Sequence, residues 1–235
     1  MKFVITITTY NRAEECASLI RQIHRFSPDI EKNVLIIDDF SDANYNHVIE
    51  LCYEYGYTFK RMAFHHGKMK HWIIADMCIQ FGAKNTNKDD YYFYLQDDLI
   101  LHEDFFNKCI NAFESIPDKY KCVLNPCLDT RTGKIWTHIQ ETIVPGLPIK
   151  KTGWIDLRFM ATKRFFLIVR RIISISELRW ENDNTLSSGV GKQISQRLAR
   201  FNIPIYQTTY SLYTHGESES LMNPESRKIN DLRSL

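Results

Sequence analysis

The sequence predicts an α/β fold in which a mostly parallel sheet carries helices on both faces. Strand-like and helix-like segments alternate four times within the first 115 residues, an order typical of parallel strands joined by right-handed helical crossovers. The runs at 34–37 and 91–95 contain only apolar and aromatic residues, as strands do when both faces are buried. We therefore expect a sheet enclosed between two layers of helices.

The first strand is predicted at 2–8, where β-branched residues are frequent. Asn11 is expected to cap the following helix, because Glu14 stands at capping-box spacing from it. Ser27-Pro28-Asp29 ends that helix, and 33–38 forms the second strand. The helix carries apolar residues at helical spacing: Cys16, Leu19, Ile20, Ile23 and Phe26.

The second helix is expected after a turn in which Ser41 or Asp42 serves as the N-cap. Gly56 ends this helix, because glycine readily adopts the left-handed conformation that follows a last helical turn. The third strand then spans 57–62, and Gly67 opens the third helix.

The fourth strand is predicted at 91–95, after a polar loop at 84–90. Pro117 stops the helix that follows, because proline removes a backbone donor and clashes with the preceding turn. The apolar residues of this helix are Phe105, Phe106, Cys109, Ile110 and Phe113.

The second half of the chain has a less regular pattern. Short strands are expected at 121–125, 133–137 and 153–159, a helix at 189–201, and a proline- and lysine-containing loop at 141–152. The stretch 158–179 mixes basic and apolar side chains, which we interpret as a helix with a solvated basic face. Contact of this stretch with an acidic acceptor, a membrane surface or nucleic acid is the alternative.

Composition places the chain among ordinary globular proteins. It has 235 residues, 44% of them hydrophobic and 25% charged, with a net charge of +2, so the total charge carries no nucleic-acid signature. No apolar run is long enough for a transmembrane segment, and the N-terminus lacks a signal-peptide pattern. The six cysteines form no CxxC pair. We expect reduced thiols and a cytoplasmic location.

The paired acids Asp97 and Asp98 follow directly on the buried strand at 91–95. Two adjacent carboxylates repel each other and lose hydration on burial, so a cation is needed beside them. Oxygen ligands suit Mg²⁺ or Mn²⁺. The pair therefore predicts a divalent metal site.

Three polar segments stand at the carboxyl ends of predicted strands: Thr8 to Arg12, Asp38 to Ser41, and Gln96 to Asp98. Ligands of open α/β sheets bind outside these ends. The rim so formed carries hydroxyls, an aromatic ring, acids and Arg12, which suits a nucleotide with its base on the ring and its phosphates on a metal.

Each acidic pair also has a simpler interpretation. Asp38 and Asp39 fit a turn with an N-cap, and Asp97 and Asp98 fit helix caps. Other nucleotide-site classes are disfavoured. The chain lacks both GxxxxGK[ST], which excludes a P-loop NTPase, and a GxGxxG after the first strand, which argues against a Rossmann dehydrogenase. The Thr at the end of the first strand excludes a phosphatase with an aspartate nucleophile there.

The segments ITITTYNR at 5–12, LIIDDFSD at 35–42 and LQDDL at 95–99 resemble the family 2 glycosyltransferases of the GT-A fold. Typical features of that family are a TYNR-type first strand end, an IDD-S-D second strand end, and a DxD or EDD metal motif. The later segments 187–195 and 211–224 resemble a subgroup frequent in bacteria and their viruses.

The resemblance implies a nucleotide-binding set. Thr8 and Tyr10 would line the base pocket, Asp39 would accept a hydrogen bond from uracil or ribose, and Asp97 would face the ribose or donor sugar. Gln96 departs from the acid common at its position. Lys68 is a candidate for the diphosphate, with a solvated lysine as the alternative, whereas Trp72 is expected to pack in the core.

The same resemblance implies that Asp98 binds the metal, Mn²⁺ or Mg²⁺, and that His215 completes its ligand shell. A single domain, 1–235, would contain a nucleotide-binding half at 1–110 and an acceptor-side half at 111–215. The remainder, 216–235, would form a tail or a lid over the nucleotide.

An inverting enzyme needs a carboxylate that takes the proton of the acceptor hydroxyl. Asp183 and Glu181, in the segment RWENDN, are the first candidates for this base, and Asp156 is the next. Caps or surface charges are the simpler interpretation of each.

The expected function is metal-dependent transfer of a sugar, with inversion, from a nucleotide-diphosphate sugar, UDP-linked, to an acceptor hydroxyl. The acceptors compatible with this expectation are a glycan, a lipid-linked sugar, a protein or a modified DNA base, in a bacterial or infected bacterial cell. The alternatives are a sugar-nucleotide-binding module without turnover and a nucleotidyltransferase.

Overall fold

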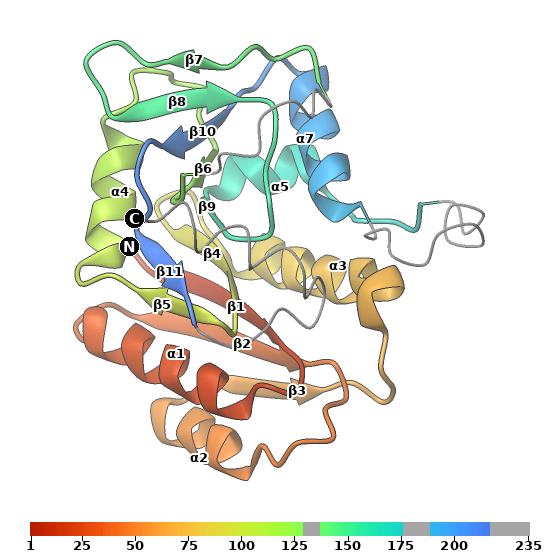
Figure 1. Ribbon diagram of the computed structural model, residues 1–235. Helices are drawn as coiled ribbons and strands as arrows, with labels where there is room; N and C mark the ends of the chain where they lie inside the picture. The colour runs from red at the N-terminus through yellow and green to blue at the C-terminus, as the bar shows by residue number, and fades with distance from the viewer. Residues whose placement is uncertain (129–136, 176–188, 217–235) are drawn as a thin grey trace.

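The computed structural model describes residues 1–128, 137–175 and 189–216 (Figure 1). Its main sheet has nine strands in the order β3-β2-β1-β4-β9-β6-β10-β8-β7. Four of them form the predicted parallel half, with β1 in its centre: β1 (Phe3–Thr9), β2 (Lys32–Asp38), β3 (Thr58–Arg61) and β4 (Tyr91–Gln96). The mixed α/β fold and its four leading strands are thereby confirmed.

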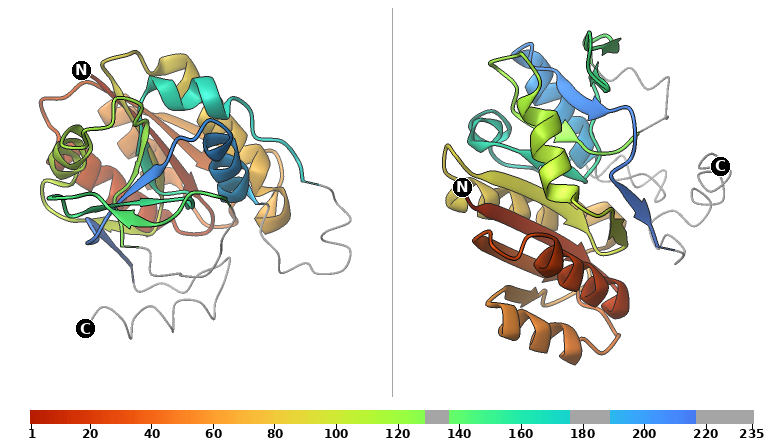
Figure 2. Two further views of the ribbon diagram at one scale, coloured as in Figure 1. Left: turned by 90° about the horizontal axis from the view of Figure 1, so that it is seen from above. Right: turned by 90° about the vertical axis from the view of Figure 1, so that its left-hand side faces the viewer.

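Helices cover both faces of the sheet (Figure 2). One apolar layer joins β1 and β2 to α1 (Ala13–Phe26), α2 (Asn46–Tyr55) and α4 (Phe105–Glu114). The other joins the opposite face to α3 (Gly67–Asn85), α5 (Lys163–Val169) and α7 (Val190–Arg200). Alternate residues of β1 enter opposite layers, because successive side chains of a strand point to opposite faces.

The second half of the chain extends the sheet with antiparallel pairs. The antiparallel pairs are β9 (Phe159–Ala161) with β4 and with β6 (Val123–Asn125), β10 (Ile205–Thr208) with β8 (Ile149–Thr152), and β8 with β7 (Thr142–Ile143). In contrast, β10 and β6 are parallel.

The prediction of a loop over 141–152 is wrong, because this region contains β7 and β8. Lys150 and Lys151 give β8 the polar composition of a loop, but its pairing with β10, which is distant in the sequence, places it in the sheet. The predicted strand at 153–159 is also wrong, since β9 begins only at Phe159; before it, the Ile155 amide bonds to Ser195 on α7. Most of the strand predicted at 133–137 falls outside the described residues.

A small second sheet joins β5 (Leu99–Leu101) to β11 (Tyr213–His215) in antiparallel order. The short β5, directly after the paired acids, was not expected from the sequence. Because His215 pairs with Leu99, the end of the described chain lies against the carboxyl end of β4.

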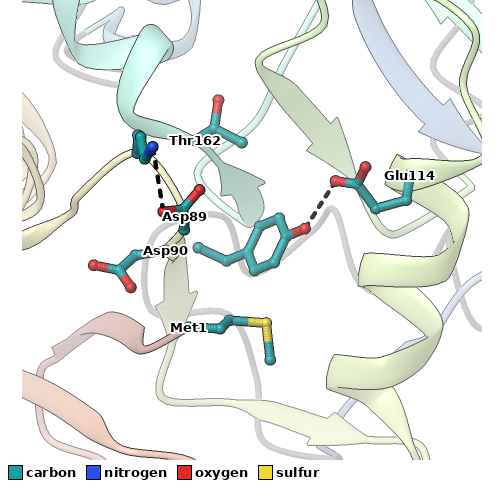
Figure 3. Close-up of a pocket in the computed structure, with 7 residues that line it drawn as sticks. Met1, Asp89, Asp90, Glu114 and Thr162 are labelled. Carbon is teal, nitrogen blue, oxygen red and sulfur yellow. Dashed lines mark hydrogen bonds and ion pairs between the residues drawn. The ribbon is translucent and has the colours of Figure 1, made fainter.

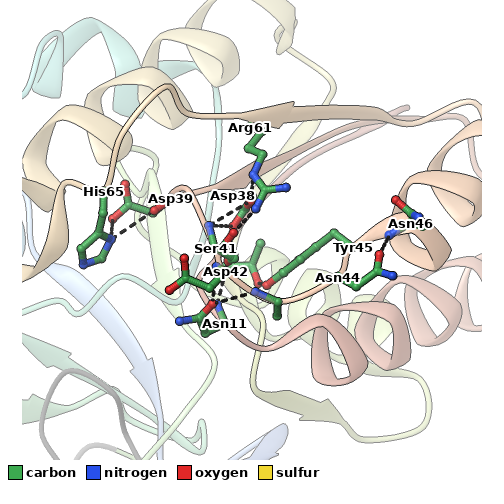
Figure 4. Close-up of polar contacts among 12 residues, drawn as sticks. Asn11, Asp38, Asp39, Ser41, Asp42, Asn44, Tyr45, Asn46, Arg61 and His65 are labelled. Atoms are coloured by element: carbon green, nitrogen blue, oxygen red, sulfur yellow. Dashed lines mark hydrogen bonds and ion pairs between the residues drawn. The ribbon is translucent and has the colours of Figure 1, made fainter.

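Gly56 ends α2 as predicted, whereas the predicted N-caps of the first two helices are wrong. Arg12, not Asn11, precedes α1, and α2 begins only at Asn46. Asn11 Oδ1 instead accepts the Asp42 amide at 2.8 Å, and Ser41 Oγ accepts the Asn11 amide at 2.7 Å (Figure 4). These hydrogen bonds join the segments that follow β1 and β2, so the side chains of Asn11 and Ser41 do not cap a helix.

Two sequence expectations concern features of the whole chain. All six cysteines lie in the described segments as free thiols. Among the described helices, none is both long and apolar enough to cross a membrane.

Candidate functional site

The carboxyl ends of three neighbouring strands form one rim. Thr9 at the end of β1 is in register with Asp38 at the end of β2, and Thr8 is in register with Gln96 at the end of β4. The segments that follow these ends therefore leave the sheet side by side, as predicted. Their acids, Asp39, Asp97 and Asp98, are all buried.

Arg12 provides a cation beside the paired acids. Its Nη1 lies 2.7 Å from Asp98 Oδ2 and 3.5 Å from Asp97 Oδ1, and all three side chains are buried. Burial, together with the neighbouring charge of Asp98, raises the pKa of Asp97 to about 7, against the opposing effect of Arg12. One guanidinium thus offsets only part of the repulsion that the sequence predicted.

His215 approaches Asp98 from the other side. Its Nδ1 lies 3.5 Å from Asp98 Oδ1, and the Gly216 amide donates to the Asp98 carbonyl at 2.8 Å. Arg158 donates from Nη1 to His215 Nε2, and its Nη2 lies 2.6 Å from Asp156 Oδ2. Because Nε2 accepts a proton donor, a neutral His215 carries its hydrogen on Nδ1, facing Asp98.

Asp39 is surrounded by donors from the start of α3. Its two carboxylate oxygens accept the His66 and Gly67 amides, at 2.9 and 3.0 Å, and His66 Nδ1 lies 2.8 Å away. His65 Nδ1 lies 3.1 Å from Asp39 Oδ2, and the His65 ring stacks on Tyr10 with 4.0 Å between centroids. Tyr10, from the end of β1, thus reaches the acid at the end of β2 through a histidine (Figure 4 shows His65 and Asp39).

The rim is distinct from a cavity of about 330 Å³ at the opposite end of β4 (Figure 3). Two of the acids that line this cavity make structural hydrogen bonds: Asp90 accepts the Lys2 amide at 2.8 Å, and Glu114 accepts the Tyr91 hydroxyl at 2.8 Å. Because it lies at the amino end of a parallel strand, it is a poor position for a ligand of this sheet.

No protein-family model matches the chain, and no curated protein matches it. Solved structures do. Staphylococcus aureus TarS aligns with a TM-score of 0.59 and 11% identity, covering 93% of this chain and 37% of TarS. Residues 1–349 of TarS in complex with UDP-GlcNAc align with a TM-score of 0.57 and 11% identity, covering 94% of this chain and 60% of that one.

Glucosyl-3-phosphoglycerate synthase from Mycobacterium tuberculosis, in complex with Mn²⁺, UDP and glucosyl-3-phosphoglycerate, aligns with a TM-score of 0.55 and 12% identity. The alignment covers 99% of this chain and 79% of the synthase. The chain has a GT-A fold. The predicted fold class is therefore confirmed, and this GT-A chain spans less than two thirds of the TarS chains that it matches.

The expected metal ligands of the GT-A chain lie together. Within the described segments, no group of three or more His, Cys, Asp or Glu side chains is placed to hold a metal ion. Asp98 and His215 supply two facing donors, an oxygen and a nitrogen 3.5 Å apart, and both kinds suit Mn²⁺. A metal bound to Nδ1 of His215 would replace the hydrogen on that nitrogen, so the hydrogen of the neutral ring would lie on Nε2. Nε2 could then no longer accept the hydrogen bond from Arg158.

The other residues predicted for the site differ in their positions and contacts. Thr8 is buried at the end of β1, and Lys68 lies in the first turn of α3. Trp72 packs against the core, as expected. Asp156 is engaged by Arg158. Glu181 and Asp183 lie outside the described residues.

Sequence reasoning missed three residues of the site, His65, His71 and Arg158. Burial lowers the pKa of His71, while the charges of Asp39 and Asp156 act in the opposite direction, so this imidazole lies within electrostatic reach of both acids. The dipeptide His65-His66 before a glycine that opens a helix was the available signal for the first of them. Nothing local marks Arg158, because its partners come from distant segments.

Proposed function

We propose that this protein is a metal-dependent glycosyltransferase that moves a sugar from a UDP-linked donor to an acceptor hydroxyl, with inversion at the anomeric carbon. The observation that carries the proposal is the convergence of Tyr10, Asp39, Asp98 and His215 at the carboxyl edge of a GT-A sheet. The neighbours in complex with UDP-GlcNAc, or with UDP and Mn²⁺, support it.

The nucleoside half of the donor would lie over the ends of β1 and β2. Tyr10 offers an aromatic face, Thr8 lines the floor, and Asp39 accepts a hydrogen bond from the base or ribose. Asp97 faces the ribose or sugar. Arg12 and Lys68, both cationic, lie at the side where the diphosphate would extend.

Asp98 and His215 would hold Mn²⁺ or Mg²⁺, with the remaining ligands taken from the diphosphate and water. When bound, the metal offsets the negative charge that develops on the departing phosphate. Arg12 would hold the Asp98 carboxylate in place before the metal arrives, since it contacts the oxygen that faces away from His215.

A carboxylate in the second half would take the acceptor proton. Asp183 and Glu181 are the first candidates and Asp156 the next. As the proton leaves, the acceptor oxygen forms a bond to the anomeric carbon, and the bond from that carbon to the diphosphate breaks with its electron pair on UDP. The residues 1–110 would thus bind the donor, and 111–215 the acceptor. A cytoplasmic location, with its supply of nucleotide sugars, fits the six free thiols.

Two measurements test this function. With Mn²⁺ present, UDP should raise the melting temperature; a rise with UTP and none with UDP would favour a nucleotidyltransferase. Slow, metal-dependent hydrolysis of a UDP-sugar should also occur, because water can replace the acceptor. A protein that binds UDP-sugars without any hydrolysis would be a binding module.

A further inference from the structure

His65 makes two contacts at the centre of the nucleoside site. Its ring is stacked on Tyr10, with 4.0 Å between centroids and 20° between planes. Its Nδ1 lies 3.1 Å from Asp39 Oδ2 and 3.1 Å from the Asp39 carbonyl oxygen. An aromatic stack and a hydrogen bond to Asp39 are the two contacts that the proposed function assigns to a base.

The Asp39 carboxylate is surrounded by nitrogen atoms while His65 is in place. It contacts two backbone amides, of His66 and Gly67, and two imidazole nitrogens, of His65 and His66. An ionised carboxylate offers about four acceptor positions. An N–H group of a base that approaches Asp39 Oδ2 therefore needs the place beside that oxygen where the His65 ring lies.

His65 is the donor that is able to leave. The side chain of His66 is 2% exposed, and both its ring and its amide are bonded to Asp39. The Gly67 amide belongs to the first turn of α3. The side chain of His65 is 43% exposed and reaches Asp39 only through its ring.

We propose that the His65 ring occupies the position of the base and must swing out before a nucleotide binds. The proposal rests on the proposed function, since it presupposes that the base stacks on Tyr10 and bonds to Asp39. His65 then sets how tightly the protein binds nucleotides, because every base has to displace the same side chain.

The competition has a defined thermodynamic signature. When only a fraction of the protein has an open site, the apparent dissociation constant equals the intrinsic one divided by that fraction. Removing the competing ring should lower the dissociation constants of UDP and CDP by the same factor. It should leave inorganic pyrophosphate unchanged, because pyrophosphate has no base. A His65 that formed a wall of the pocket would have the opposite effect.

The experiment is calorimetric titration of the full chain with UDP, CDP and pyrophosphate, each with Mn²⁺. We expect His65→Ala to bind UDP and CDP about tenfold more tightly than the unmodified protein, a change of about 1.4 kcal/mol. His65→Phe keeps a ring that can stack on Tyr10 but loses the bond to Asp39. Its affinity for UDP and CDP should lie between those of the unmodified protein and His65→Ala. His65→Ser repeats the test if the alanine variant fails to fold.

His24→Ala is the matched control. His24 stacks on Tyr55 with the same 4.0 Å between centroids, away from the rim, so this variant should bind all three ligands as the unmodified protein does. Weaker or unchanged UDP binding by the His65 variants, with normal binding by the unmodified protein, overturns the role of His65 alone. If neither the unmodified protein nor any variant binds UDP, the proposed function itself fails.

Discussion

His215 Nδ1 lies 3.5 Å from Asp98 Oδ1, although the two residues stand far apart in the chain. The pairing of β11 with β5 fixes this approach, since His215 is in register with Leu99, the residue after Asp98. The Gly216 amide adds a bond to the Asp98 carbonyl. The acid that ends the buried strand thus meets a nitrogen donor from the second half of the fold.

Asp98→Ala should abolish Mn²⁺-dependent UDP binding, because it removes the metal's carboxylate ligand. His215→Ala, which leaves Asp98 in place, should weaken Mn²⁺ binding about 10- to 100-fold, the range found for changes around metal sites. Titration of Mn²⁺ followed by electron paramagnetic resonance, with UDP present, measures both. Asp42→Asn, at an exposed acid near the rim, is the control. Unchanged Mn²⁺ affinity in Asp98→Ala would rule out the metal assignment.

Arg12 is expected to stabilise the metal-free protein by its contact with both acids. Arg12→Met should lower the free energy of unfolding by about 3–5 kcal/mol, because it removes the cation that lies against both buried carboxylates. Mn²⁺ with UDP should recover part of this loss, since the metal replaces the missing cation. Urea unfolding measures the effect. Arg21→Met, at an exposed position of α1, should change stability by less than about 0.5 kcal/mol.

Asp97 should give the metal-free protein an unusual pH dependence. Its pKa rises from 3.8 to about 7 on folding, through burial and the charge of Asp98, so the folded state holds a proton that the unfolded state has lost. This group's contribution to stability therefore falls as pH rises from about 4 to about 7, and is constant above. The change is on the order of a few kcal/mol.

Asp97→Asn, which cannot titrate, tests that dependence. Comparing its urea midpoints at pH 5 and pH 8 with those of the unmodified protein isolates the contribution of Asp97. The unmodified protein should lose more stability between the two pH values than the variant does. Equal losses in both proteins would mean that Asp97 is ionised throughout this range.

The parallel half of the fold could be predicted from the sequence because each of its strands has a recognisable local sequence pattern. The run at 33–38 is almost the whole of β2, and 91–95 is β4 without its last residue. The rim followed from this order alone, since parallel strands bring their carboxyl ends to one edge. Local pattern and sheet position agree here, which is why three distant motifs could be placed together.

The rest depends on long-range partners that a local pattern does not contain. The sequence of β8 resembles a polar loop, and only its pairing with β10 identifies it as a strand. Asn11 has the sequence pattern of a helix cap, but its side chain bonds to the loop after β2. Arg158 carries no motif. A sequence indicates which side chains are able to bind a proton or a metal, whereas the tertiary structure decides which of them meet.

Gly82 should resist replacement by alanine even though it lies within helix α3. Alanine normally favours a helix over glycine by about 1 kcal/mol, but a Cβ at this position would stand 2.5 Å from Phe166 and 2.7 Å from Tyr92. Both rings are packed in the core, so the overlap should dominate. We expect Gly82→Ala to destabilise the protein by about 1–2 kcal/mol in urea unfolding. Adding Phe166→Leu should recover part of the loss; purely additive effects would contradict this packing account.

The catalytic base can be located by separating donor binding from transfer. Asp183→Asn and Glu181→Gln should bind UDP and Mn²⁺ as the unmodified protein does, because the proposed nucleotide contacts lie at the ends of β1, β2 and β4. The variant that removes the base should release UDP from a UDP-sugar at least about 100-fold more slowly, the usual contribution of a general base. Asp156→Asn should behave differently, because Asp156 holds Arg158 and, through it, His215. We expect this third variant to bind Mn²⁺ more weakly as well as to react more slowly. If Asp183→Asn and Glu181→Gln both react normally, and Asp156→Asn loses only its rate, then Asp156 is the base.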